Sequence, residues 1–94
     1  MAAAAPRRLV TRIQTGVRIE QSLLNVLKSL ATLKGMRLGE LLEGIVLHAL
    51  EGKAPFSAGT LAQIGDLKRI YGLELTAQDS HALEEPAARR SARK

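Results

Sequence analysis

The sequence predicts a small, mainly α-helical protein with one N-terminal β-strand, two core helices and a C-terminal helical extension, assembled as a homodimer. Three observations lead to this fold class. Residues 9–19 alternate between apolar and polar side chains, two later stretches have helical periodicity, and a second strand pattern is not found. The expected organisation is a flexible arm at 1–8, a strand-and-two-helix dimerisation domain at 9–52, a helical extension at 53–85 and a disordered basic tail at 86–94.

Residues 9–19 have the alternation that is typical of a half-buried strand. One side would carry Ile13, Thr15, Val17 and Ile19, and the other would carry Arg12, Gln14, Gly16 and Arg18. A lone strand leaves its backbone N–H and C=O groups without partners. We therefore expect this strand to pair with its copy in a second chain, which predicts a dimer.

Two helices are predicted next, over residues 20–34 and 38–50. In the first, leucines recur at helical spacing, Glu20 or Ser22 serves the first turn, and Lys34 followed by Gly35 marks the end. The second is apolar on nearly all sides and ends before Gly52. A helix without a wide polar face is normally buried on several sides, so it too indicates a partner subunit.

The extension at 53–85 should contain two further helices. Ser57 or Thr60 can cap the first, which ends at Gly72. The sequence Thr76-Ala-Gln-Asp79 looks like an abbreviated capping box for a short helix that continues to about residue 85. This regular pattern favours a helical appendage packed on the dimer over a loose segment.

The net charge of +5 is distributed unevenly along the chain. From Arg7 to Arg37 there are seven basic residues and one acid, from Leu38 to Glu85 there are three basic and eight acidic residues, and the remainder adds four basic residues. A basic first third beside an acidic middle indicates one face that meets a polyanion such as nucleic acid.

The sequence does not suggest an enzyme, a cofactor or a metal site. Cysteine is absent, and His48 and His81 are far apart in the sequence and lack matching ligands. A core of this size also looks too small to shape a pocket. The sequence has no recognisable signal peptide or membrane span, so we expect a cytoplasmic protein.

The segment from about Arg12 to Glu51 resembles the ribbon-helix-helix family of bacterial Arc, Met and CopG-type repressors. The likeness lies in Val17-Arg18-Ile19, in the leucine pattern Leu23-x3-Leu27-x2-Leu30-Ala31, and in the turn and second helix beginning Lys34-Gly35-Met36-Arg37-Leu38-Gly39-Glu40-Leu41-Leu42. The resemblance covers a little under half of the chain. It implies a homodimeric, sequence-specific transcriptional regulator, most simply a repressor, that inserts a two-stranded ribbon into the major groove of double-stranded DNA. Such a protein would be nucleoid-associated.

The resemblance also implies which residues touch DNA. By position, the base-contacting side chains are Arg12, Gln14 and Arg18, since Arg suits guanine and Gln suits adenine. The start of the second helix, at Arg37, Leu38 and Gly39, would rest on a phosphate through its backbone N–H groups. Arg7 and Arg8 are further candidates for phosphate contact.

Two positions depart from the family pattern. Gly16 stands where the family often has another groove-facing side chain, and Gly39 stands where many members have Ser or Thr. A minimal member of the family would end near Gly52, so an alternative function stays open: a dimerising interaction protein, or an antitoxin-like protein, whose segment 56–85 binds a protein partner.

Overall fold

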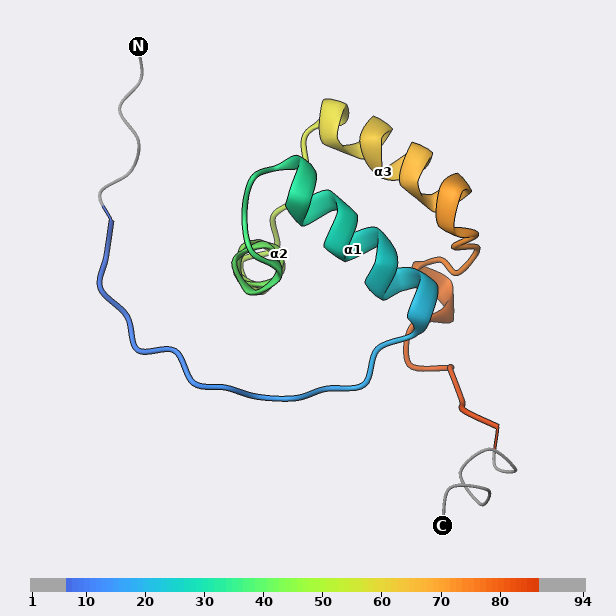
Figure 1. Ribbon diagram of the computed structural model, residues 1–94, viewed down its shortest axis with the longest axis horizontal. Coiled ribbons are helices and arrows are strands. Elements are labelled where there is room, and N and C mark those ends of the chain that lie inside the picture. Colours follow the sequence, from blue (N-terminus) through green and yellow to red (C-terminus); the bar gives the residue numbers. More distant parts are fainter. Residues whose placement is uncertain (1–6, 87–94) are drawn as a thin grey trace.

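The computed structural model describes residues 7–86, which form three α-helices and one short 3-10 helix without any β-strand (Figure 1). The helices are α1 (Gln21–Leu33), α2 (Leu38–Leu50) and α3 (Ala58–Tyr71), and the 3-10 helix is η1 (Ala77–Asp79). The fold is therefore mainly α. Most of the expected arm at 1–8 and nearly all of the expected tail at 86–94 lie outside the described residues.

The predicted strand at 9–19 is wrong, and so is the two-stranded ribbon that depended on it. Residues 7–20 are irregular and are not hydrogen-bonded as a strand. The side expected to be buried is open to solvent, with Ile13 81% and Val17 73% exposed. The physical reason is that a strand is stabilised by pairing, and no second extended segment lies beside this one in residues 7–86.

Helix α1 begins and ends as its sequence predicts. The Glu20 carboxylate accepts a hydrogen bond from the backbone N–H of Leu23 at 2.8 Å, which satisfies one of the free donors in the first turn. At the other end, Gly35 adopts a left-handed conformation (φ 70°), and the N–H of Met36 donates to the carbonyl of Ala31 at 3.0 Å. Glycine takes this conformation without steric cost, so the chain reverses here into α2.

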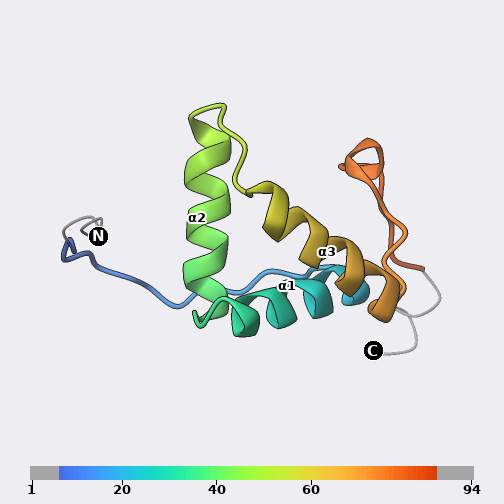
Figure 2. The ribbon, with the colours of Figure 1, turned by 90° about the horizontal axis from the view of Figure 1, so that it is seen from above.

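In Figure 2, helix α2 stands nearly perpendicular to α1, and α3 slopes from the far end of α2 towards the start of α1. Leu41 is buried and Ile45 packs against the core, whereas Val46, Leu47 and Leu50 are 50%, 64% and 78% exposed. The residues beyond Ile45 therefore have little to pack against within the described chain. These exposures agree with the expectation that one short chain cannot bury so apolar a helix.

Helix α3 runs antiparallel to α1 and packs against it (Figures 1 and 2). Its first turn is capped by Ser57, whose hydroxyl accepts from the N–H of Thr60 at 3.2 Å. Two polar contacts join the helices: Lys34 Nζ donates to Thr60 Oγ1 at 2.6 Å, and the hydroxyls of Ser29 and Tyr71 lie 2.8 Å apart. The C-terminal extension is therefore fixed to the side of α1.

The core is small and draws on all three helices. Its buried members are Val26, Leu30, Ala31, Leu41 and Leu67, and Leu30 is the most buried of them with 1% exposed. Partly buried Leu27, Ile45, Phe56, Ile64 and Leu73 surround this cluster.

The last predicted helix is shorter than the sequence suggested. The capping box is present, because the Asp79 carboxylate accepts from the backbone N–H of Thr76 at 2.8 Å and the N–H of Gln78 donates to the Thr76 hydroxyl at 3.3 Å. However, the helical turn covers only Ala77–Asp79 and does not continue to residue 85. Few apolar residues follow Asp79, so little packing is gained by extending the helix.

Candidate nucleic-acid-binding segment

The chain before α1 is an exposed, irregular segment rich in arginine. We call residues 7–18 the arginine segment; it contains Arg7, Arg8, Arg12 and Arg18 and no acidic residue. All its side chains are classed as exposed, and in Figure 1 it passes beside α2 before it reaches the start of α1. A strand-free basic segment on a helical body is a suitable shape for entering a groove of DNA.

Arg12 is held by a carboxylate of α2. Its Nε and one terminal nitrogen donate to the two carboxylate oxygens of Glu43, each at 2.8 Å. This is the paired, parallel geometry in which a guanidinium also binds phosphate or the edge of guanine. The hydrogen bonds and the positive charge of Arg12 lower the pKa of Glu43. This carboxylate therefore stays ionised at pH values at which an ordinary glutamate is already partly protonated.

Arg18 makes a second contact of the same kind with Glu85. Nε lies 2.8 Å from one carboxylate oxygen and the terminal nitrogen 2.6 Å from the other. The arginine side chain is 70% exposed and the glutamate 41% exposed. Both arginines expected to read bases are therefore paired with acids of the same chain, and DNA would have to displace these acids.

The other predicted contacts in this segment are open to solvent. Gln14, Arg7 and Arg8 are exposed, and neither Arg7 nor Arg8 makes an ion pair with a described residue. Gly16 has nothing within 4 Å of the position that a Cβ atom would take, so no close approach within the chain requires glycine there.

The predicted phosphate site at the start of α2 is partly occupied. Arg37 is the N-cap residue of α2, and its backbone N–H donates to the Glu40 carboxylate at 2.9 Å. Glu40 thus brings a negative charge to the helix N-terminus, where a phosphate would otherwise gain from the free N–H groups. Gly39 is exposed and Leu38 is partly buried, so the backbone of this turn is only partly accessible.

The structure brings Arg12 to α2 but keeps Arg18 apart from it. Arg12 contacts Glu43 in the second turn of α2 and also feels the charge of Glu40 in the first turn. Arg18 instead lies beside Glu85, which follows η1. The arginine segment is thus attached to the helical body at two places, both through acidic side chains that the sequence analysis did not identify. The uneven distribution of charge is the only signal for them in the sequence, since Glu43 and Glu85 belong to the acidic middle of the chain.

The structure also contains a cavity, which the sequence analysis did not expect. It has a volume of about 350 Å³ and lies between α1, α3 and residues 73–83. The expectation that the core is too small to shape a pocket is therefore wrong. Leucines after Gly72 fold back across the α1–α3 pair and form the missing wall, and no periodic pattern in the sequence announces such a return.

No protein-family model matches the chain, and no curated protein or solved structure matches it significantly. In the described part of the chain, no helix is both long enough and apolar enough to cross a membrane.

Proposed function

We propose that the protein is a homodimeric, sequence-specific DNA-binding regulator whose arginine segment contacts DNA. The observation that carries this proposal is the exposure of four arginines, without an acid among them, along one extended stretch of backbone. Arginine is the most common side chain for both phosphate and guanine contacts, and glutamine at position 14 adds a side chain suited to adenine. Such a protein would act at the nucleoid.

The arrangement of the acidic residues supports nucleic acid as the ligand, rather than a nonspecific attraction to any anion. Arg12 and Arg18 each hold a carboxylate with two parallel hydrogen bonds, which is the geometry of a paired contact with phosphate or guanine, and both side chains are exposed enough for DNA to replace that carboxylate. All nine acidic residues lie in residues 20–85 beside six basic ones, which leaves the four arginines of the segment as a run of uniformly positive charge.

The homodimer is supported by a second apolar face of α2. Leu42, Val46 and Leu50 follow one another at four-residue spacing and form a stripe that flanks the side of α2 carrying Leu41 and Ile45. Val46 and Leu50 are at least half exposed. A second α2 crossing this stripe would bury it, and two arginine segments would then be available to one DNA site.

The packing of α3 favours this function over the alternative of a partner-wrapping protein. Leu67 is buried in the core and Ile64 packs against it, so part of the apolar surface of α3 is already used within the chain. A segment that wraps a partner would leave that surface uncovered.

The test compares a duplex from the region upstream of the protein's own gene with a scrambled duplex of equal composition, using fluorescence anisotropy at two salt concentrations. Gln14→Ala should weaken binding to the upstream duplex about 5- to 150-fold and leave the scrambled duplex unaffected, because a base contact carries sequence information. Arg7→Ala should weaken binding to both and reduce the salt slope by about 1.

The matched control is Arg69→Ala, which removes one positive charge from α3, where Arg69 is exposed and paired with Asp66. It should bind both duplexes nearly as the parent does. If Arg69→Ala and Arg7→Ala weaken binding equally, net charge alone drives the interaction. If the parent binds neither duplex, the proposed function is wrong.

A further inference from the structure

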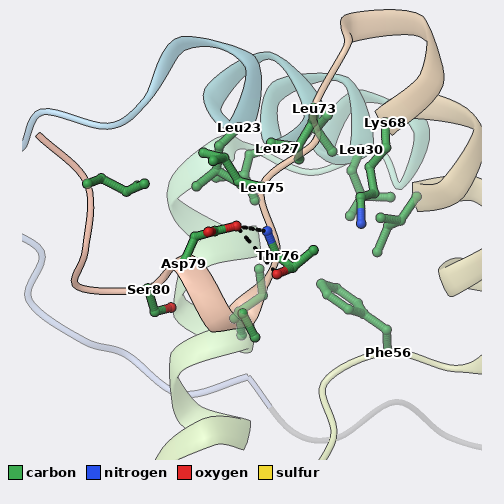
Figure 3. A pocket seen from close by; sticks show the side chains of 15 residues that line it. Leu23, Leu27, Leu30, Phe56, Lys68, Leu73, Leu75, Thr76, Asp79 and Ser80 are labelled. Carbon is green, nitrogen blue, oxygen red and sulfur yellow. Dashed lines mark hydrogen bonds between the residues drawn. The ribbon is translucent and has the colours of Figure 1, made fainter. Parts of the chain in front are cut away.

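The cavity between α1, α3 and residues 73–83 has the composition of a site for a small amphiphilic molecule. Its wall is mostly aliphatic and includes Leu23, Leu27, Leu30, Phe56, Ile64 and Leu73 (Figure 3). At about 350 Å³ it lies within the range of small-molecule sites, and it is open to solvent. An apolar wall that faces water is unfavourable unless something covers it.

One positive charge lies in this wall without a counter-ion. Lys68 of α3 lines the cavity, is partly buried, and makes no ion pair with a described residue. Figure 3 shows its nitrogen inside the ring of apolar side chains, on the side away from Asp79. The acid of this cavity, Asp79, is engaged elsewhere, since its carboxylate accepts from the backbone N–H and the hydroxyl of Thr76 at 2.8 and 3.4 Å.

We propose that the cavity binds a medium-chain monocarboxylate, with its tail on the leucines and its carboxylate on Lys68. A volume of 350 Å³ holds about twelve heavy atoms when each takes about 30 Å³, the share of a water molecule in the liquid, and a ten-carbon carboxylate has that size. Lys68 favours an anionic head over a neutral or cationic one. Asp79 in the same wall disfavours a doubly charged head such as a phosphate monoester.

A second copy docked on α2 would occupy a different place. Val46 and Leu50, the exposed residues that it would cover, do not line the cavity, although their neighbour Ile45 does. The binding of the carboxylate is independent of whether the protein binds DNA, so either proposal can fail alone.

The experiment titrates the full-length protein with sodium decanoate by isothermal titration calorimetry, below the concentration at which decanoate forms micelles. Decanol and decyltrimethylammonium serve as neutral and cationic probes of the same chain length. We expect saturable binding of one decanoate per chain, with decanol about tenfold weaker and the cation weaker still, because a hydrogen bond to a charged group stabilises the head.

Two variants locate the site. Lys68→Met should lower decanoate affinity about tenfold, to the level of decanol, without changing decanol binding. Lys53→Met is its control, since Lys53 is exposed, pairs with Glu51 and does not line the cavity. Ala77→Phe should fill the cavity and abolish binding of both ligands, whereas Ala62→Phe, on an exposed position of α3, should leave binding unchanged. Circular dichroism checks that each variant keeps its helices.

Three results would overturn the proposal. The first is the absence of saturable decanoate binding to the parent protein. The second is equal loss of affinity in the Lys68 and Lys53 variants, which would mean attraction to overall positive charge. The third is decanoate affinity that falls as protein concentration rises, which would mean that a second copy covers the cavity.

Discussion

Glu43→Gln should strengthen DNA binding, because it releases Arg12 from the contact that it makes within the chain. The two hydrogen bonds from Arg12 to Glu43 use the same guanidinium edge that a phosphate or guanine would need. Every DNA complex that uses this edge must first break the ion pair. Gln keeps the size of the side chain but removes the charge that makes the contact favourable.

The magnitude follows from the exposure of the pair. The Arg12 and Glu43 side chains are 60% and 46% exposed, so solvent screens their attraction and the pair is formed for only part of the time. Exposed ion pairs of this kind reduce the fraction of free arginine by about two- to sixfold. DNA affinity should rise by about that factor for each Arg12 that contacts DNA, and by its square if both protomers of a dimer contribute.

The assay is fluorescence anisotropy on the upstream duplex, with Glu51→Gln as the matched control. Glu51 follows the last residue of α2, is exposed, and pairs with Lys53, so its replacement removes one negative charge without releasing an arginine of the segment. The ratio of the two affinities isolates the release of Arg12. This ratio should fall towards one at high salt, because the ion pair is then screened in the parent protein as well.

The dependence on pH gives an independent check. Arg12 lowers the pKa of Glu43, so the parent pair persists at mildly acidic pH and is lost only as pH falls through that lowered pKa. The parent and Glu43→Gln should converge below this point and differ above it. Equal affinities of Glu43→Gln and Glu51→Gln at low salt and neutral pH would refute the reasoning, because Arg12 would then not take part in binding.

Other substitutions test the fold and the dimer. Leu30→Ala should cost about 2–5 kcal/mol in thermal or urea unfolding, because it opens a cavity in the core, whereas Leu33→Ala, at a position 58% exposed, should change stability little. Val46→Glu places a charge on the outer stripe of α2 and should shift a homodimer towards monomer in sedimentation equilibrium; a parent that is monomeric at high micromolar concentration would contradict this. The pKa of Glu20 is lowered chiefly by the Ser22 hydroxyl and also by the Leu23 N–H, so its contribution to stability should be present above the ordinary glutamate pKa and lost as pH falls through the lowered value. Glu20→Gln should weaken this acid dependence in circular dichroism melts, and an unchanged dependence would contradict the assignment.

The helices could be predicted from the sequence because their signals are local. Glu20 before the first turn, Gly35 after the last, and leucines at helical spacing between them define α1 without reference to the rest of the chain. The same holds for Ser57 and Gly72 at the ends of α3. Caps and left-handed glycines act within a few residues, so a pattern of ten or fifteen residues contains the information.

The N-terminal segment was predicted wrongly because a strand is not a local structure. Alternation at Ile13 and Val17 shows that the segment could form a strand, but hydrogen bonds to another strand decide whether it does. The candidate site was predicted only in part, again because contacts between distant parts of the chain decide its structure. The sequence identifies Arg12 and Arg18 as exposed basic residues, but their partners Glu43 and Glu85 are 31 and 67 positions away, and only the folded chain brings them together.

The dependence of α1 on α3 has a consequence for how the protein is made. Val26 and Leu30 are covered by Leu67, which leaves the ribosome well after α2 is complete. Until then the nascent chain has α1 and α2 joined only through Leu41, and the leucines that α3 covers later would be exposed to solvent or to neighbouring chains. A fragment that stops at Gly52 reproduces this intermediate permanently. The chain after Gly52 thus completes the core, because it supplies Leu67.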